Sequence, residues 1–160
     1  MSDTKKGDIV TPNSADQIGA ILFACNINAV RSAMAETMVK DAFPGKIFVD
    51  SCGVTPGIQD GFATAVMQEI GLDMSAHQPK SFDDLDSGFY DVIISFSPEA
   101  HAAAEALTQN MGCATFYWPV DNLANLTGSR EEMLRAYRHV RDDIRNKLSI
   151  YFGKPIAGNT

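Results

Sequence analysis

The sequence predicts a single α/β domain in which a four-stranded parallel sheet carries helices on both faces. Compact apolar runs alternate four times with segments of helical spacing, and this alternation is typical of parallel strands joined by crossover helices. The chain has 160 residues, of which 45% are hydrophobic, so it can bury one sizeable core. Nothing in the sequence suggests a second domain.

The first half of the chain contains two predicted strands, each followed by a helix. Residues 20–24 form an apolar run, and residues 32–43 place apolar side chains at helical spacing before a Pro-Gly pair. Residues 46–51 are compact and rich in β-branched and aromatic side chains, as strands are. The next helix ends at Gly71. Its apolar face is formed by Ala63, Val66, Met67 and Ile70.

The second half repeats this pattern twice. Residues 90–96 predict a third strand, and the alanine-rich helix after it begins at a proline and extends over 98–110. Residues 114–119 predict the fourth strand. A capping box at residues 129–132 then starts a long last helix. One face of that helix is lined by Leu134, Tyr137, Val140, Ile144 and Leu148.

Composition limits the possible partners and the compartment. Thirteen basic and twenty acidic residues give a net charge of −7, which disfavours binding to nucleic acid or to acidic membrane surfaces. No run approaches the roughly 18 apolar residues that a membrane-spanning helix needs. Three scattered cysteines form neither a disulfide framework nor a zinc pattern, so we expect a reducing cytoplasm. Residues 1–17 are interpreted as a flexible leader, 18–153 as the folded domain and 154–160 as a C-terminal tail.

A cysteine lies where the first predicted strand meets the first helix. The first N–H groups of a helix have no intrahelical partners and, with the helix dipole, favour an anion at this point. This field and Arg31 both favour the thiolate of Cys25, and Arg31 can donate two parallel hydrogen bonds to a tetrahedral anion. Ser32 can donate to the sulfur. The alternative is a buried cysteine at a strand end and a solvated arginine.

The residues around Cys25 resemble the motif of low-molecular-weight protein tyrosine phosphatases, a group that also includes the thioredoxin-coupled arsenate reductases. The usual motif is an apolar strand, then Cys-x-Gly-Asn-x-x-Arg-Ser, a small residue and Met-Ala-Glu. Ile27 replaces the loop glycine, which narrows the backbone freedom of the loop. The matching residues are Cys25, Asn28, Arg31, Ser32, Met34, Ala35 and Glu36.

The resemblance implies a strand order of 2-1-3-4 and a site at the carboxyl ends of the strands. It also implies that the loop binds phosphate through Asn26, Ile27, Asn28, Ala29, Val30, Arg31 and Ser32.

Three further residues take implied roles from the same resemblance. Ser51 would support the loop through a hydrogen bond, and His77 would brace Asn28. Asp121 follows the fourth strand and would be the general acid, while Asn122 replaces the proline that usually comes next. The alternatives are a turn serine, an ordinary surface or core histidine and a turn-forming Asp-Asn pair.

The leading interpretation is a cysteine-dependent phosphomonoester phosphatase that acts through a phosphocysteine. Cys25 would be the nucleophile, Arg31 would bind the anion and Asp121 would be the acid, with no metal or cofactor. The substrate would be a phosphorylated small molecule or a phosphotyrosine protein.

Two alternatives stay open. Arsenate reduction by a thioredoxin-type relay needs cysteines after the third strand, where residues 95–98 contain none, whereas a glutathione-dependent variant needs one cysteine and stays an alternative. The other alternative is a catalytically silent domain that binds phosphate or phosphotyrosine. A further hypothesis concerns Cys52, which ends the strand predicted to lie beside the first strand. Peroxide would then form a protective Cys25–Cys52 disulfide.

Overall fold

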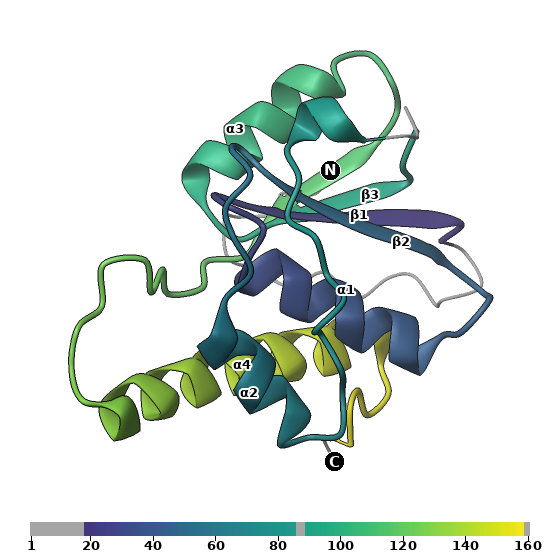
Figure 1. Ribbon diagram of the computed structural model, residues 1–160. Coiled ribbons are helices and arrows are strands. Elements are labelled where there is room, and N and C mark those ends of the chain that lie inside the picture. Colours follow the sequence, from purple (N-terminus) through teal and green to yellow (C-terminus); the bar gives the residue numbers. More distant parts are fainter. Residues whose placement is uncertain (1–17, 86–88, 159–160) are drawn as a thin grey trace.

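The computed structural model describes residues 18–85 and 89–158, so the predicted leader at residues 1–17 lies outside the described residues. The four strands form one parallel sheet in the order β2-β1-β3-β4, which confirms the predicted fold class and strand order. The strands are β1 (Ala20–Cys25), β2 (Phe48–Gly53), β3 (Val92–Ser95) and β4 (Ala114–Tyr117). Figure 1 shows the central sheet with helices above and below it.

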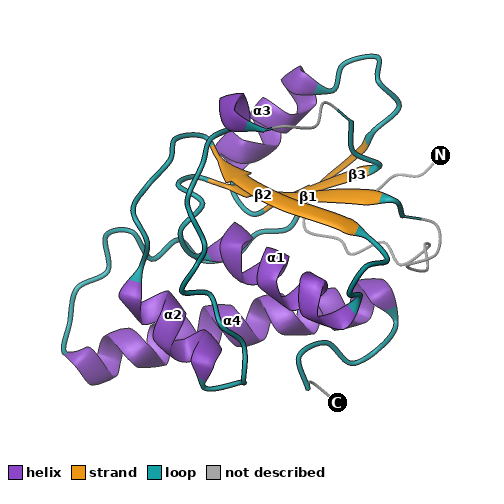
Figure 2. Ribbon diagram, turned by 45° about the vertical axis from the view of Figure 1, so that its right-hand side comes forward, coloured by secondary structure: helices purple, strands orange, loops and turns teal. Residues whose placement is uncertain are grey.

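The described residues also form four α-helices and one short 3-10 helix, and the last α-helix follows the fourth strand. The helices are α1 (Arg31–Ala42), α2 (Gly61–Gln68), η2 (Phe82–Asp84), α3 (Pro98–Leu107) and α4 (Arg130–Phe152). Three helices, α1, α2 and α4, cover one face of the sheet, and α3 covers the other (Figure 2). The predicted capping box is present, because Ser129 accepts from the amide of Glu132 and Glu132 accepts from the amide of Ser129.

Some predicted boundaries differ from the observed ones. The second strand begins at Phe48 and continues to Gly53, two residues later than predicted at each end, because its pairing with β1 continues to the level of Cys25. Helix α3 ends at Leu107 rather than near Asn110, which has a left-handed backbone (φ 65°). The segment predicted as a tail packs on the domain, since the side chain of Ile156 is fully buried.

The sheet separates two apolar clusters of different size. The larger cluster lies under α1, α2 and α4 and contains Trp118 and Tyr151, whose rings meet edge to face with centroids 5.5 Å apart. The smaller cluster lies under α3 and includes Leu22 and Ile93. Burying each large apolar side chain stabilises the fold by roughly 1.5–3 kcal/mol. None of the helices in the described part of the chain has the length and apolar character needed to cross a membrane.

Candidate active site

The site is built on the five-residue loop that joins β1 to α1. Asn28, in the middle of this loop, is fully buried and has a left-handed backbone with φ 58°. Ile27 is not among the described residues with positive φ, so replacement of the family's glycine strains no backbone there. Gly53 allows the loop to lie against β2, because a Cβ at Gly53 would come within 2.8 Å of the loop backbone.

The carbonyl groups of the loop are directed away from its interior. The carbonyls of Cys25, Asn26 and Ile27 accept hydrogen bonds from the chain that follows β2, and His77 donates from Nε2 to the carbonyl of Asn28 at 2.7 Å. The three amide donors are Val54 (3.0 Å), Thr55 (3.0 Å) and Gly57 (2.9 Å). Within the described residues, the amides of residues 27–30 have no protein acceptor, and α1 begins without a side-chain cap. These N–H groups therefore form a cradle suited to an oxyanion.

Cys25 ends β1 at the base of this cradle. Its side chain is buried, and its sulfur lies 2.9 Å from Oγ of Ser32 in the first turn of α1. Ser32 Oγ also accepts a hydrogen bond from Nδ2 of Asn28 at 2.9 Å. Its own proton has two acceptors within reach, the sulfur of Cys25 at 2.9 Å and the carbonyl of Cys52 at 3.4 Å. The structure thus brings together the predicted nucleophile and the predicted hydroxyl donor.

Arg31 is almost entirely buried, with 5% of its surface exposed. Its Nη1 donates to the carbonyl oxygens of Phe96 (2.9 Å) and Val120 (3.0 Å), which follow β3 and β4. Nε and Nη2 have no acceptor within residues 18–85 and 89–158, so one edge of the guanidinium is available for an anion. The two carbonyl bonds fix the plane of the group, which suits bidentate binding.

The surroundings of Arg31 act on its pKa in opposite directions. Burial lowers the pKa of the Arg31 guanidinium, whereas Cys25, Tyr117, Glu99 and Asp121 act in the opposite direction. Three groups other than Cys25 that can carry a negative charge therefore lie close enough to Arg31 to raise its pKa. This electrostatic coupling places the predicted acid, Asp121, in the same neighbourhood as the nucleophile.

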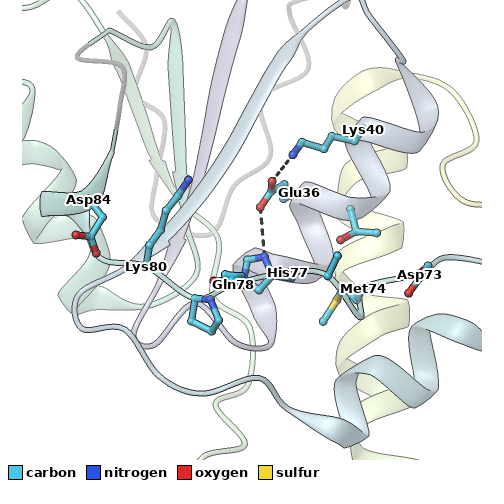
Figure 3. A pocket seen from close by; sticks show the side chains of 11 residues that line it. Glu36, Lys40, Asp73, Met74, His77, Gln78, Lys80 and Asp84 are labelled. Carbon is cyan, nitrogen blue, oxygen red and sulfur yellow. Dashed lines mark hydrogen bonds and ion pairs between the residues drawn. The ribbon is translucent and has the colours of Figure 1, made fainter.

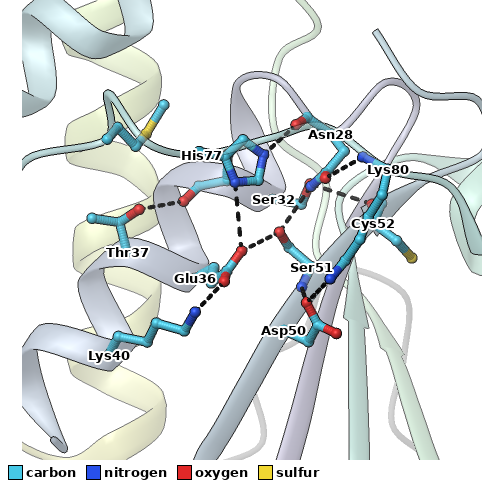
Figure 4. Close-up of polar contacts among 12 residues, drawn as sticks. Asn28, Ser32, Glu36, Thr37, Lys40, Asp50, Ser51, Cys52, His77 and Lys80 are labelled. Atoms are coloured by element: carbon cyan, nitrogen blue, oxygen red, sulfur yellow. Dashed lines mark hydrogen bonds and ion pairs between the residues drawn. The ribbon is translucent and has the colours of Figure 1, made fainter. Parts of the chain in front are cut away.

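A polar network fixes the loop from behind (Figure 4). Asn28 donates from Nδ2 to Ser51 Oγ at 2.8 Å, and its Oδ1 accepts from the amide of Lys80 at 3.0 Å. Ser51 donates in turn to Glu36, which also lies 3.8 Å from Nδ1 of His77. Ser51 and His77 thus occupy the places expected of supporting residues, although His77 contacts the backbone of Asn28. Because every member has a partner, the network holds the left-handed Asn28 in one geometry.

The sequence analysis assigned no role to two further residues that support the loop, Glu36 and Ser97. Glu36 belongs to the quoted motif, but no role was assigned to it, and it joins Ser51 to His77. Ser97 caps α3 by accepting from the amide of Ala100 (3.1 Å) and donates to Oδ1 of Asn26 at 2.6 Å. The Ser-Pro pair at the start of α3 predicts the cap, but no local pattern predicts the contact with the loop.

Asp121 lies in a cavity of about 320 Å³ that opens beside Arg31, at the carboxyl ends of β3 and β4. We call it the Asp121 cavity. Its walls also include Asn26, Ser97, Glu99, Tyr117 and Asn122. Asp121 is exposed, as a residue that exchanges protons with substrate and water must be.

A second, much smaller space also adjoins Arg31 and Asn122. It measures about 40 Å³ and reaches Cys25. In its wall, Tyr137 donates to Oδ2 of Asp60 at 2.7 Å, while Oδ1 of Asp60 accepts the first amides of α2. Burial and this bond to Asp60 raise the pKa of Tyr137. The pair ties α4 to α2 at the edge of the site.

A larger cavity, about 760 Å³, adjoins the polar network, and Cys25 is not in its lining. It is lined by Lys40, Asp73, Met74, Gln78 and Asp84, together with the Glu36–His77 pair (Figure 3). Volume alone would direct attention there. Its lining contains neither Cys25 nor the loop residues 27–30 nor Arg31, so it is not the space at the predicted nucleophile.

The other two cysteines are not placed to react with Cys25. In the register of β1 and β2, Cys52 pairs with Ala24 and Cys25 pairs with Gly53, so the two side chains point to opposite faces of the sheet. Cys113 precedes β4, at the opposite end of the sheet from Cys25. The geometry therefore disfavours the Cys25–Cys52 disulfide, which would require backbone movement.

Comparison with known proteins identifies the family of the chain. The family model of low molecular weight phosphotyrosine protein phosphatase matches residues 20–154. An arsenate reductase of Halalkalibacterium halodurans is 28% identical over 131 residues, which are 82% of this chain and 93% of that protein. A glutaredoxin arsenate reductase of Synechocystis sp. is 37% identical over 75 residues, 47% of this chain. That match spans only 57% of the relative's own length.

Solved structures show the same fold. The tyrosine phosphatase amsI of Erwinia amylovora superposes with a TM-score of 0.70 at 16% identity, covering 91% of this chain and 97% of that one. An arsenate reductase in the phosphate binding state gives a TM-score of 0.61 at 28% identity, covering 82% and 98%. Since the family model spans most of the sequence, the chain belongs to the low molecular weight phosphotyrosine protein phosphatase family, which includes phosphatases and arsenate reductases.

Proposed function

We propose that the protein is a cysteine-dependent phosphomonoester phosphatase whose substrate is a phosphorylated small molecule or a phosphotyrosine protein. The observation that supports this proposal is that Cys25, the loop residues Ile27 and Val30, and Arg31 line one small space, where the loop amides have no protein acceptor within the described residues. A tetrahedral dianion at this point would have its phosphorus in front of the sulfur and its oxygens on N–H donors.

The proposed reaction has two steps. In the first, the Cys25 thiolate attacks phosphorus, the bond from phosphorus to the leaving oxygen breaks, and Asp121 gives its proton to that oxygen. In the second, water attacks the phosphocysteine, Asp121 takes its proton, and inorganic phosphate leaves as the thiolate is restored. Ser32 would stabilise the sulfur anion in both steps, because its hydroxyl lies 2.9 Å away.

Arsenate reduction is the second candidate, and the names of the sequence relatives favour it. The same cradle accepts arsenate, which has the shape and charge of phosphate. Reduction of arsenate to arsenite takes two electrons from thiols, yet Cys52 and Cys113 lie on the far face and at the far end of the sheet. The resemblance to the thioredoxin-coupled reductases implies relay cysteines after the third strand, where this chain has Ser97. An external thiol, such as glutathione with glutaredoxin, would therefore have to supply the electrons.

One panel of assays on a single purified sample separates the candidates. Phosphate release is measured with phosphotyrosine, phosphoserine and phenyl phosphate, and arsenite formation is measured with thioredoxin or with glutathione and glutaredoxin. We expect phosphate release from at least one ester and no thioredoxin-dependent arsenite. Arsenite formed only with glutathione and glutaredoxin, without phosphate release, would support the reductase. Anion binding without either activity would support a silent binding domain.

A further inference from the structure

Two of the contacts that hold Asn28 come from one short segment, residues 77–81, which we call the brace. His77 Nε2 contacts the carbonyl of Asn28 at 2.7 Å, and the amide of Lys80 donates to Oδ1 of Asn28 at 3.0 Å. Residues 77–80 belong to no helix or strand. The position of the brace therefore depends on the contacts that tie it to the sheet.

Lys80 ties the brace to β2, the edge strand, at two levels. Its carbonyl accepts from the amide of Gly53 at 2.8 Å, beside an isolated bridge between Gly53 and Ser81. Its Nζ lies 2.6 Å from Oδ1 of Asp50, earlier in the same strand. Figure 4 shows the Lys80 side chain extended from the level of Asn28 to this ion pair.

The ion pair acts from the face of the sheet opposite to Ser51. In the register of β1 and β2, Asp50 pairs with Leu22, which lies in the smaller apolar cluster under α3. Ser51, the next residue of the strand, points to the other face and contacts Asn28 directly. Asn28 is thus tied to β2 from both faces, by Ser51 on one side and through Lys80 and Asp50 on the other.

The charge of Asp50 is poorly explained by stability alone. Only 6% of the surface of Asp50 is exposed, and Oδ1 also accepts from the amide of Ser51 at 2.9 Å. Burial of a carboxylate carries a desolvation penalty that an ion pair can at best offset, and apolar side chains in the same place are often equally stable. An ion pair differs from an apolar contact because it fixes the position of one charged atom relative to the other.

We propose that Asp50 and Lys80 are positioning residues that hold the brace, and through it the left-handed Asn28, in the geometry in which the loop binds a phosphoryl group. The inference rests on the proposed function only in that the loop binds a tetrahedral anion. A loop that already has the binding geometry loses less conformational freedom when the anion arrives, so its affinity is higher. Loss of the ion pair should therefore weaken anion binding, although neither residue lines the small space at Cys25.

The test is a double-mutant cycle on the affinity for inorganic phosphate, measured by calorimetry. Asp50→Asn and Lys80→Met remove the charges singly and together, and they leave the backbone bond from residue 80 to Asn28 available. Each single variant should bind phosphate about 3- to 30-fold more weakly, and the double variant should bind no more weakly than the weaker single variant. Lys80→Arg keeps the positive charge and should retain most of the affinity.

Asp143 and Lys147 supply the matched control, because they form an ion pair of the same two residue types within α4 and do not line the space at Cys25. Asp143→Asn and Lys147→Met should leave the phosphate affinity unchanged. Urea unfolding of every variant adds a second readout, since a merely structural pair would lower the free energy of unfolding without changing the affinity of the folded protein. If Lys80→Met fails to fold around an unpaired carboxylate, the double variant, which has no such charge, still measures the effect.

Wild-type affinity in the double variant, or losses that add in it, would overturn the inference. Turnover of phenyl phosphate by the wild type separates this result from the proposed function. Weaker phosphate binding in the Asp50 and Lys80 variants, without turnover by the wild type, keeps the inference and removes the phosphatase. Turnover by the wild type with unchanged affinities does the reverse, and a wild type that binds no phosphate removes both.

Discussion

Cys25 ends β1, and Cys52 is the last residue but one of the neighbouring β2, yet the surroundings of the two side chains differ. Cys25 meets the hydroxyl of Ser32, the uncapped start of α1 and the charge of Arg31. Cys52 points into the small apolar cluster under α3, where burial raises the pKa of its thiol and keeps it protonated at neutral pH. A cysteine at the carboxyl edge of a parallel sheet therefore does not always meet the groups that favour a thiolate. In this protein only the side chain on the face of α1 meets them.

The largest expected effect is that of Cys25→Ser. A serine hydroxyl in this place is a far weaker nucleophile than a thiolate, so turnover of 4-nitrophenyl phosphate should be abolished. The amide cradle and Arg31 remain, so phosphate binding measured by calorimetry should persist. Cys113→Ser is the matched control, because it makes the same chemical change at the opposite end of the sheet, and it should keep full activity. Turnover that survives in Cys25→Ser would remove the nucleophile assignment.

Asp121→Asn should give the next largest effect, and it depends on the leaving group. A basic phenolate leaves poorly without a proton, and positioned proton transfer contributes about 10²–10⁴-fold. A nitrophenolate leaves almost unaided. The variant should therefore slow phenyl phosphate by that factor while 4-nitrophenyl phosphate loses much less, and the acid limb of the pH–rate profile should flatten. Equal losses with both substrates would make Asp121 structural, and Glu99, in the same cavity, would be the next candidate.

A smaller effect is expected where the network holds Asn28 behind the loop. Asn28→Gly keeps the left-handed backbone available but removes the bonds to Ser32, Ser51 and Lys80. Loss of these buried bonds should lower the free energy of unfolding by roughly 1–3 kcal/mol and lower kcat. Asn28→Ala adds the strain of a left-handed residue with a Cβ, about 1–2 kcal/mol more. Urea unfolding and steady-state kinetics measure the two parts separately.

Asn110→Gly is the control for backbone conformation, because Asn110 is also left-handed (φ 65°) but lies in the exposed turn after α3. It should change neither kcat nor KM. Full activity in Asn28→Gly would mean that the cradle keeps its shape without the side-chain network.

Local sequence patterns predicted most of the elements that form the site around Cys25. The alternation of strands and helices, the β1–α1 loop and the capping box at Ser129 all depend on neighbours within a few positions. The predicted bounds of the second strand are two residues too early, because the ends of this strand are set by its pairing with β1 and local periodicity carries no information about that pairing. The same limit applied to the environment of Cys52, since the side of the sheet that it faces depends on register.

The contacts that sequence analysis missed join distant parts of the chain. Ser97 and Asn26 are 71 positions apart, and Tyr137 and Asp60 are 77 apart. Neither pair has a pattern of its own, because each residue is also a common capping or core residue. The packing of Ile27 against the backbone of Gly57 also joins segments that are not neighbours in the sequence. The sequence showed the departure from the family's motif but not its consequence.

Cys52→Ala should have the smallest effect, and it tests the comparison of the two cysteines directly. The thiol packs among apolar side chains, so its loss should cost about 1 kcal/mol of stability and leave kcat and KM unchanged. Peroxide should inactivate wild type and variant at the same rate, because the side chains of Cys25 and Cys52 lie on opposite faces and cannot form a disulfide without backbone movement. Peptide mapping after mild peroxide should find no Cys25–Cys52 disulfide in the wild type. Finding it, together with faster inactivation of the variant, would mean that the sheet edge opens and that Cys52 protects the nucleophile. Without it, any arsenate reduction by this chain must take its resolving thiol from another molecule.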